Sequence, residues 1–133
     1  MADISLFESV FQVLKPKNMA KFMIVKHNGE IIGMCLVLIY RNVLFVWYLG
    51  AFRAALKLHP TNLLPWHVME WGSKNKFNIF DFGGAGKPDE DYGVRDFKGR
   101  FGGDLVNYGR YTKINSHIIL GIAKYGFKIY RKL

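Results

Sequence analysis

Hydrophobic residues recur at helical spacing near the start of the chain and then gather into three short runs. Residues 4–14 carry an apolar side chain every three or four positions, which predicts an amphipathic helix. The runs that follow are rich in β-branched and aromatic residues, and they predict strands over 21–27, 30–40 and 43–49. Asn28-Gly29 and Arg41-Asn42 separate these strands as tight turns. The pattern therefore predicts an antiparallel meander.

A second helix and a fourth strand are predicted next. Leu64, Val68 and Trp71 lie on one helical face, and we expect a helix capped by Thr61 or Asn62, with Pro65 in its first turn. The apolar run 77–82 then predicts a strand. A strand that returns through a helix usually runs parallel to its neighbour, so this strand should be parallel to 43–49.

The last third of the chain predicts a loop, a strand and a helix. Residues 83–103 are glycine-rich, and a short helix is expected at 94–101. A fifth strand is predicted over 105–114. Asn115 or Ser116 should cap a final helix that ends near residue 130. The predicted fold class is therefore α/β (α+β): a mixed sheet with helices on both faces, in a single domain spanning 1–133.

Composition and charge narrow the function classes. The chain has 133 residues, half of them hydrophobic, and a formal net charge of +9. This excess favours an anionic substrate or partner, although lysines also serve solubility alone. The acidic N-terminal segment lacks the features of a secretory signal, and no apolar run is long enough to cross a membrane. With Cys35 as the only cysteine, no disulfide is expected, and we expect a cytoplasmic protein.

The candidate chemistry lies in the segment 80–103, which reads FDFGGAGKPDEDYGVRDFKGRFGG. Asp81 ends an apolar strand and precedes Gly83-Gly84, so its carboxylate either orients an amine substrate or holds the turn by binding loop amides. Glycines beside charges allow a ligand to approach the backbone closely. Gly83, Gly84, Gly93 and Gly102 are therefore candidate substrate-binding positions.

Two cations follow in the same segment. Lys98 and Arg100 would share one face of an extended chain, with Phe97, Gly99 and Phe101 on the other face. Such cations either bind a phosphate, stabilise charge that develops on an acyl carbonyl, or simply face solvent. No His, Cys, Asp or Glu spacing fits a metal site.

Two further features carry open alternatives. Trp47 and Tyr48 should point to opposite faces of their strand, so that one faces the helices. Either Tyr48 lines a substrate cleft, or both are packed aromatic residues. The final helix places Lys124, Lys128 and Arg131 on one basic stripe, which is either a surface for tRNA or membrane or a solvated helix face.

The motif Phe80-Asp81-Phe82-Gly83-Gly84, followed by Gly93, Phe97-Lys98 and Phe101-Gly102, resembles the C-terminal signature of the Fem-type peptidyltransferases. These form a branch of the GNAT acyltransferase superfamily, and the resemblance extends more loosely over residues 22–113. It implies a GNAT-like fold whose first strand and helix are missing here, so the chain would be a C-terminal half that pairs with an N-terminal half or a second copy.

The resemblance also implies a reaction. It places Lys98 at or near the transfer site. The strand-end position of Asp81 makes this residue the second catalytic candidate, and Arg100, Phe101 and the nearby glycines are the candidate substrate contacts. The activity would be acyl or aminoacyl transfer onto an amine, as in cell-wall peptide synthesis, with aminoacyl-tRNA as a donor. Residues 55–62 lack the glycines with which GNAT enzymes bind a pyrophosphate, which argues against acetyl-coenzyme A. The alternative is a non-catalytic half-domain that binds a polyanion or packs on a catalytic partner.

Overall fold

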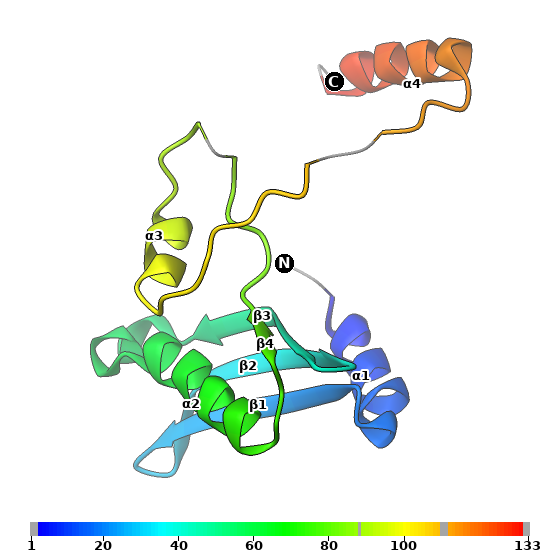
Figure 1. The fold of residues 1–133 in the computed structure, drawn as a ribbon. Coiled ribbons are helices and arrows are strands. Elements are labelled where there is room, and N and C mark those ends of the chain that lie inside the picture. The colour runs from blue at the N-terminus through cyan, green and yellow to red at the C-terminus, as the bar shows by residue number, and fades with distance from the viewer. Residues whose placement is uncertain (1–2, 88, 110–111, 132–133) are drawn as a thin grey trace.

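The fold is described by a computed structural model that covers residues 3–87, 89–109 and 112–131. Its helices and strands follow one another in the order shown in Figure 1. The elements are α1 (Ile4–Val13), β1 (Ala20–His27), β2 (Glu30–Tyr40), β3 (Val43–Ala51), α2 (Pro60–Lys74), β4 (Ile79–Asp81), α3 (Gly93–Gly99) and α4 (His117–Tyr130). Two 3-10 turns, η1 (Lys15–Lys17) and η2 (Arg53–Leu58), precede β1 and α2.

The described strands form one four-stranded sheet in the order β1-β2-β3-β4. The first three are antiparallel neighbours, and β4 runs parallel to β3 (Figure 1). Asn28 and Arg41 take the positive φ angles that the two tight turns require. The predicted mixed sheet, with its meander and its parallel crossover strand, is therefore confirmed.

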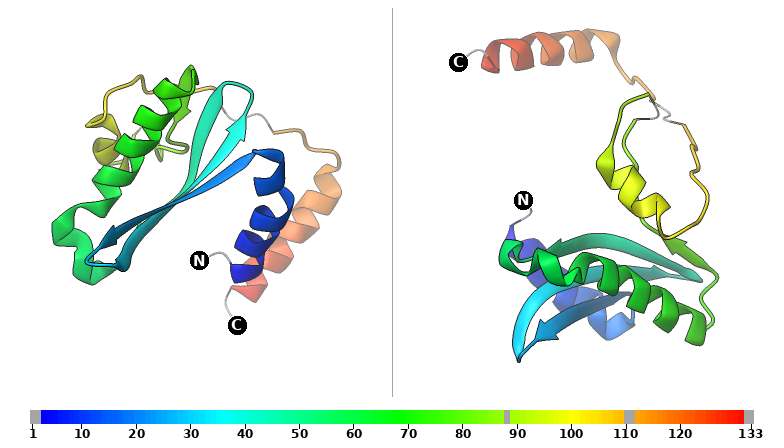
Figure 2. Two further views of the ribbon diagram at one scale, coloured as in Figure 1. Left: turned by 90° about the horizontal axis from the view of Figure 1, so that it is seen from below. Right: turned by 90° about the vertical axis from the view of Figure 1, so that its left-hand side faces the viewer.

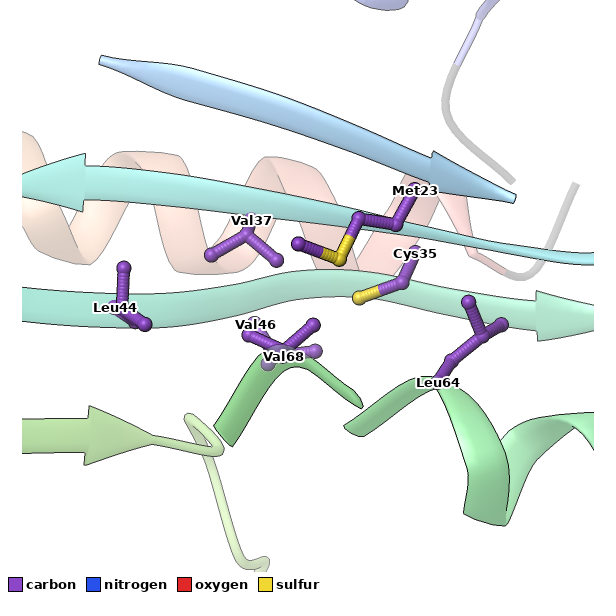
Figure 3. Close-up of a cluster of buried hydrophobic side chains, with 7 residues drawn as sticks. All are labelled: Met23, Cys35, Val37, Leu44, Val46, Leu64 and Val68. Carbon is purple, nitrogen blue, oxygen red and sulfur yellow. The ribbon is translucent and has the colours of Figure 1, made fainter. Parts of the chain in front are cut away.

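A helix covers each face of the sheet (Figure 2). On one face α2 packs against the central strands, and seven side chains form the main core: Met23, Cys35, Val37, Leu44, Val46, Leu64 and Val68 (Figure 3). On the other face α1 contributes Val10 to a second cluster with Ala20 and Leu36. Because successive side chains of β2 and β3 point alternately into these two clusters, the meander lies between the two cores and contributes to both.

The start of α2 differs from its prediction. The helix begins at Pro60, directly after His59, which adopts a left-handed backbone conformation. Thr61 and Asn62 are therefore helical residues and not caps, and Pro65 lies inside the helix and not in its first turn. Proline suits the first helical position because its missing N–H has no partner there in any helix. His59 therefore occupies the N-cap position of α2, which the sequence pattern predicted for Thr61 or Asn62.

The predicted fifth strand is not present in the described part of its range. Residues 105–109 and 112–114 carry no strand, and 110–111 lie outside the described residues. The fourth strand is also shorter than predicted, at Ile79–Asp81. After this short strand the chain turns away from the sheet, so the later apolar residues have no neighbouring strand to pair with. Leu105 and Tyr108 remain largely exposed as a result.

A β-bulge overturns the expectation that Trp47 and Tyr48 face opposite sides. The register between β2 and β3 shifts, so that Leu36 pairs with Tyr48 while Val37 pairs with Val46. Trp47 is the extra residue, and a bulge of this kind breaks the strict alternation of side chains. Both aromatic rings consequently pack on the cluster beneath α1, with their centroids 5.1 Å apart.

Gly72 lets α2 lie close to β3. A β-carbon at this position would stand 2.5 Å from Cδ1 of Leu44, which is itself fully buried in the main core. The leucine tip has little room to move because a core is packed as densely as an organic crystal.

We expect Gly72→Ala to lower the free energy of unfolding by about 1–3 kcal/mol, because the added methyl overpacks the α2–β3 contact. Urea denaturation followed by tryptophan fluorescence measures this. Ser73→Ala, at an exposed site in the same helix, is the control and should change stability by less than about 0.5 kcal/mol. Equal stability of the two variants would show that α2 moves freely on the sheet.

Candidate functional site

The candidate site begins where β3 and β4 part. The parallel pairing joins Val43–Phe45 to Ile79–Asp81 and then stops, although β3 continues to Ala51. Beyond this point the β4 side of β3 has no strand partner in the described residues, so the two parallel strands diverge at the carboxyl end of β4. In open sheets with parallel strands, ligands bind at such a place.

Asp81 closes β4 with a turn. One of its carboxylate oxygens, Oδ1, accepts a hydrogen bond of 2.6 Å from the backbone N–H of Gly83. Gly83 has a φ of +71°, and a β-carbon there would meet the Phe45 ring at 2.9 Å. The glycine is therefore required both by the turn and by the close approach of the chain to β3. The Asp81 side chain remains exposed.

Lys98 reaches back from α3 to this turn. Its ammonium Nζ donates hydrogen bonds to the carbonyl oxygens of Phe82 and Gly84, at 2.7 and 2.6 Å. Partial burial lowers the pKa of Lys98 below its ordinary value, and the negative charge of Asp81 partly offsets this effect. The structure thus places a half-buried cation beside the exposed carboxylate at the end of β4.

Arg95 binds the next part of the same loop, and sequence reasoning missed it. Its Nε donates to the carbonyl of Ala85 at 3.1 Å, and Nη2 donates to the carbonyls of Lys87 and Glu90, both at 2.6 Å. Arg95 and Lys98 stand three positions apart on α3, so they project from one side of this short helix. The predicted helix over this segment, together with the three-residue spacing between Arg95 and Lys98, was the sequence signal that could have identified Arg95.

Aromatic rings pack α3 to the end of β4. Phe82 contacts Phe80 and Phe101, with ring centroids 4.7 and 5.2 Å apart, and Phe101 contacts Phe97 at 5.3 Å. Phe97 and Phe101 are four positions apart and lie together because the segment is helical as far as Gly99. The short helix expected at 94–101 is present as α3, so Lys98 and Arg100 do not share a face as they would in an extended segment.

The other predicted site residues are placed unequally. The carbonyl of Gly84 accepts a hydrogen bond from Lys98, and Gly93 is the first residue of α3. A β-carbon at either glycine would have no neighbouring atom within 4 Å. Arg100 and Gly102 are exposed at the end of α3. Tyr48 lies elsewhere, since its ring stacks edge-on against Phe7 of α1 at 4.9 Å. The structure brings Asp81, Gly83, Gly84, Lys98 and Phe101 together.

The segment before α2 is where a donor pyrophosphate would be expected in a coenzyme A enzyme. It consists of the 3-10 turn Arg53–Leu58 and His59, and no side chain caps the helix that follows. A proline occupies the first helical position and removes one amide. The segment contains no glycine through which a phosphate could reach the backbone.

Other kinds of site are not found in the described part of the chain. It holds no group of three or more His, Cys, Asp or Glu side chains arranged for a metal ion. Within the same residues, no helix is long and apolar enough to cross a membrane. Complete burial of Cys35 raises the pKa of its thiol to about 12, which suits a core residue and not a nucleophile. A shallow hollow of about 310 Å³ lies on α2, at Trp66, Met69 and Glu70, away from Asp81.

Comparison with known proteins identifies relatives of this fold. The family model described as an acetyltransferase (GNAT) domain matches residues 2–98. A search of curated proteins found no match.

Solved structures with the same fold include two aminoglycoside acetyltransferases and a regulator. AAC(6')-Iy in complex with a bisubstrate analogue is 14% identical, with a TM-score of 0.63 over 86% of this chain and 82% of that chain. AAC(6')-IG from Acinetobacter haemolyticus is 15% identical, with a TM-score of 0.61 over 87% and 83%. A transcriptional regulator from Bacillus halodurans C-125 is 15% identical, with a TM-score of 0.61 over 84% and 77%. At these identities the likeness shows the fold alone.

We expect Lys98→Ala to lower the free energy of unfolding by about 1 kcal/mol, because two charge-assisted hydrogen bonds to loop carbonyls are lost from a half-buried site. Chemical denaturation measures the loss. Arg100→Ala is the matched control, since it removes the same charge from an exposed position two residues away and should change stability by less than about 0.5 kcal/mol. Identical curves for the two variants would show that Lys98 does not hold the loop.

Proposed function

This chain belongs to the acetyltransferase (GNAT) domain family, and we propose that it transfers an acyl or aminoacyl group onto an amine bound beside Asp81. The observation that supports this most directly is the point where β3 and β4 part, at which the exposed Asp81 carboxylate ends β4 and Lys98 binds the turn that follows. The related folds that carry named activities are N-acetyltransferases, which also use an amine as the acceptor.

In the proposed reaction, the amine nitrogen attacks the carbonyl carbon of the donor directly. The nitrogen–carbon bond forms as the donor's leaving group departs, and the amine loses a proton. Oδ1 of Asp81 is engaged by Gly83, which leaves the second oxygen to orient the amine and accept that proton. The backbone amides of β3 beyond Phe45, which have no strand partner on the β4 side in the described residues, and the charge of Lys98 stabilise the oxyanion. Positioning supplies much of the rate.

The donor in this proposal is an aminoacyl-tRNA or a similarly anionic carrier. Two features support it: the net charge of +9 and the absence of glycine from the segment before α2. The acceptor is an anionic molecule with a primary amine, such as a cell-wall peptide precursor, as the Fem-type resemblance of residues 80–103 suggests. A polycationic aminoglycoside suits this basic chain less well, because like charges repel.

A second function is favoured by a specific observation. Lys98 and Asp81 both form hydrogen bonds with backbone groups of the loop that follows β4. A non-catalytic binding domain could use the same hydrogen bonds to fix its loop. In that case the domain recognises a polyanion or packs on a catalytic partner. Donor consumption in the presence of an acceptor separates the two functions, because a binding domain consumes no donor.

We expect no tight binding of acetyl-coenzyme A, because residues 53–60 offer a pyrophosphate few accessible amides. Isothermal titration of the full chain measures this, with aminoacyl-tRNA titrated in parallel. A dissociation constant for acetyl-coenzyme A in the low micromolar range, about −8 kcal/mol, would contradict the proposed choice of donor.

We expect Asp81→Asn to reduce transfer by at least about tenfold and to leave the melting temperature nearly unchanged. An asparagine oxygen can still accept the Gly83 hydrogen bond, but the neutral amide neither attracts an ammonium nor accepts its proton. A steady-state assay of donor consumption with an amine acceptor measures the rate. The control is Asp89→Asn, an exposed loop carboxylate. Equal rates for both variants would remove Asp81 from the reaction.

A further inference from the structure

The helix α4 stands away from the rest of the protein. It follows residues 100–109 and 112–116, which carry no helix or strand, and Figures 1 and 2 show it beyond the sheet and its two covering helices. Ser116 caps it by accepting a hydrogen bond from the N–H of Ile119. None of its side chains is buried, although most are large and apolar.

The side chains of α4 are sorted into two faces. At about 100° per residue, the basic groups of Lys124, Lys128 and Arg131 fall within an arc of ~60°. The opposite side carries only apolar and small residues, and its large exposed members are Ile118, Ile119, Ile122, Ile129 and Tyr130, while Tyr125 and Phe127 lie at the borders between the two faces. No acidic residue occurs from Leu105 to the end of the sequence. Such a face, wide and apolar beside a purely cationic one, is typical of helices that lie in a membrane interface.

An isolated helix of this composition needs an apolar surface to be stable. α4 has 14 residues, and a helix of that length is marginal in water on its own. Gly121 and Gly126 lie in its interior, and each costs about 1 kcal/mol relative to alanine. The helix is therefore best explained by a surface that covers its apolar face.

The positive charge of α4 indicates which kind of partner covers its apolar face. We propose that α4 binds the surface of an anionic lipid bilayer, with its apolar face among the acyl chains and its cations at the headgroups. A bilayer satisfies both faces at once, whereas a polyanionic nucleic acid would pair with the cations and leave the isoleucines in water. A second copy of the chain would bring together two molecules that each carry a net charge of +9.

The geometry fits a helix that lies along the bilayer. Its 14 residues span ~21 Å, which is shorter than the ~30 Å hydrocarbon core, so the axis runs parallel to the surface. Tyr125 and Tyr130 have amphipathic rings that favour the headgroup region. The segment 100–116 separates α4 from α3, so binding requires no change in the loop that Lys98 and Arg95 hold.

The test uses the full chain and sedimentation with lipid vesicles. We expect binding to vesicles of phosphatidylcholine with about 30% phosphatidylglycerol and at least tenfold weaker binding to pure phosphatidylcholine. The double variant Lys124→Ala/Lys128→Ala should reduce partitioning about 25-fold, because each lysine near an anionic surface accounts for about a fivefold effect. Lys26→Ala/Lys57→Ala removes two exposed lysines from the body and should bind like the parent.

A second pair of variants tests the apolar face. Ile122 on α4 and Ile4 on α1 are both 69% exposed, so they are matched in residue type and exposure. Ile122→Ser should weaken vesicle binding roughly tenfold, since a buried isoleucine contributes strongly to partitioning, and Ile4→Ser should not. Unchanged melting temperatures check that each variant is folded.

Four outcomes would overturn the proposal. The first is no difference between anionic and neutral vesicles, and the second is equal binding by Ile122→Ser and Ile4→Ser. The third is a stable dimer in analytical ultracentrifugation that Ile122→Ser dissociates, which would assign α4 to a second copy. Binding of bulk tRNA that depends on Lys124 and Lys128, together with no vesicle binding, would assign it to nucleic acid. None of these results bears on the Asp81 site, because α4 lies outside it.

Discussion

The backbone carbonyls that follow β4 accept hydrogen bonds from side chains and not from a neighbouring strand. The sheet ends at Asp81, and the carbonyl oxygens of Phe82, Gly84, Ala85, Lys87 and Glu90 all accept hydrogen bonds from two cationic side chains of α3. The hydrogen bonds to Phe82 and Ala85 are partly buried, where a backbone carbonyl without a partner would cost stability. Lys98 and Arg95 therefore fix the path of the loop, and the loop in turn fixes where the Asp81 carboxylate stands. The candidate site depends on this arrangement more than on any contact within the sheet.

The two cores and the site are organised by different forces. The meander is positioned by apolar burial on both faces, with α2 held close by Gly72 and α1 by Val10. The site adds little apolar burial, since α3 has no buried residue. Contacts between aromatic rings, such as Phe82 with Phe101, and hydrogen bonds from charged side chains hold α3 in place. Changes in the core should therefore act on global stability, while changes in α3 should act on the local geometry around Asp81.

The sequence predicted the elements whose signals are local. Asn28-Gly29 and the alternating apolar runs define the meander, and the crossover rule predicted β4 as parallel. It could not predict features that arise from pairing. The bulge at Trp47 depends on the register with β2, and the missing strand at 105–114 depends on where the chain leaves the sheet. Of the site, the motif pointed to Asp81, Gly83 and Lys98. Arg95 was missed because it lies outside the motif residues, and only its spacing to Lys98 on the predicted helix could have indicated it.

A lysine that holds a loop can still act on a substrate. The carbonyls that bind Lys98 are neutral, so the ammonium keeps its full positive charge, and its field extends to the exposed Asp81 carboxylate. Partial burial strengthens that field because less water screens it, and the same burial lowers the pKa of Lys98. A cation fixed in this way needs no reorganisation as negative charge develops on a carbonyl, which is the condition for electrostatic stabilisation of a transition state. Structural anchoring and catalytic preorganisation are therefore compatible in this residue, and the loop that constrains it would be part of the mechanism.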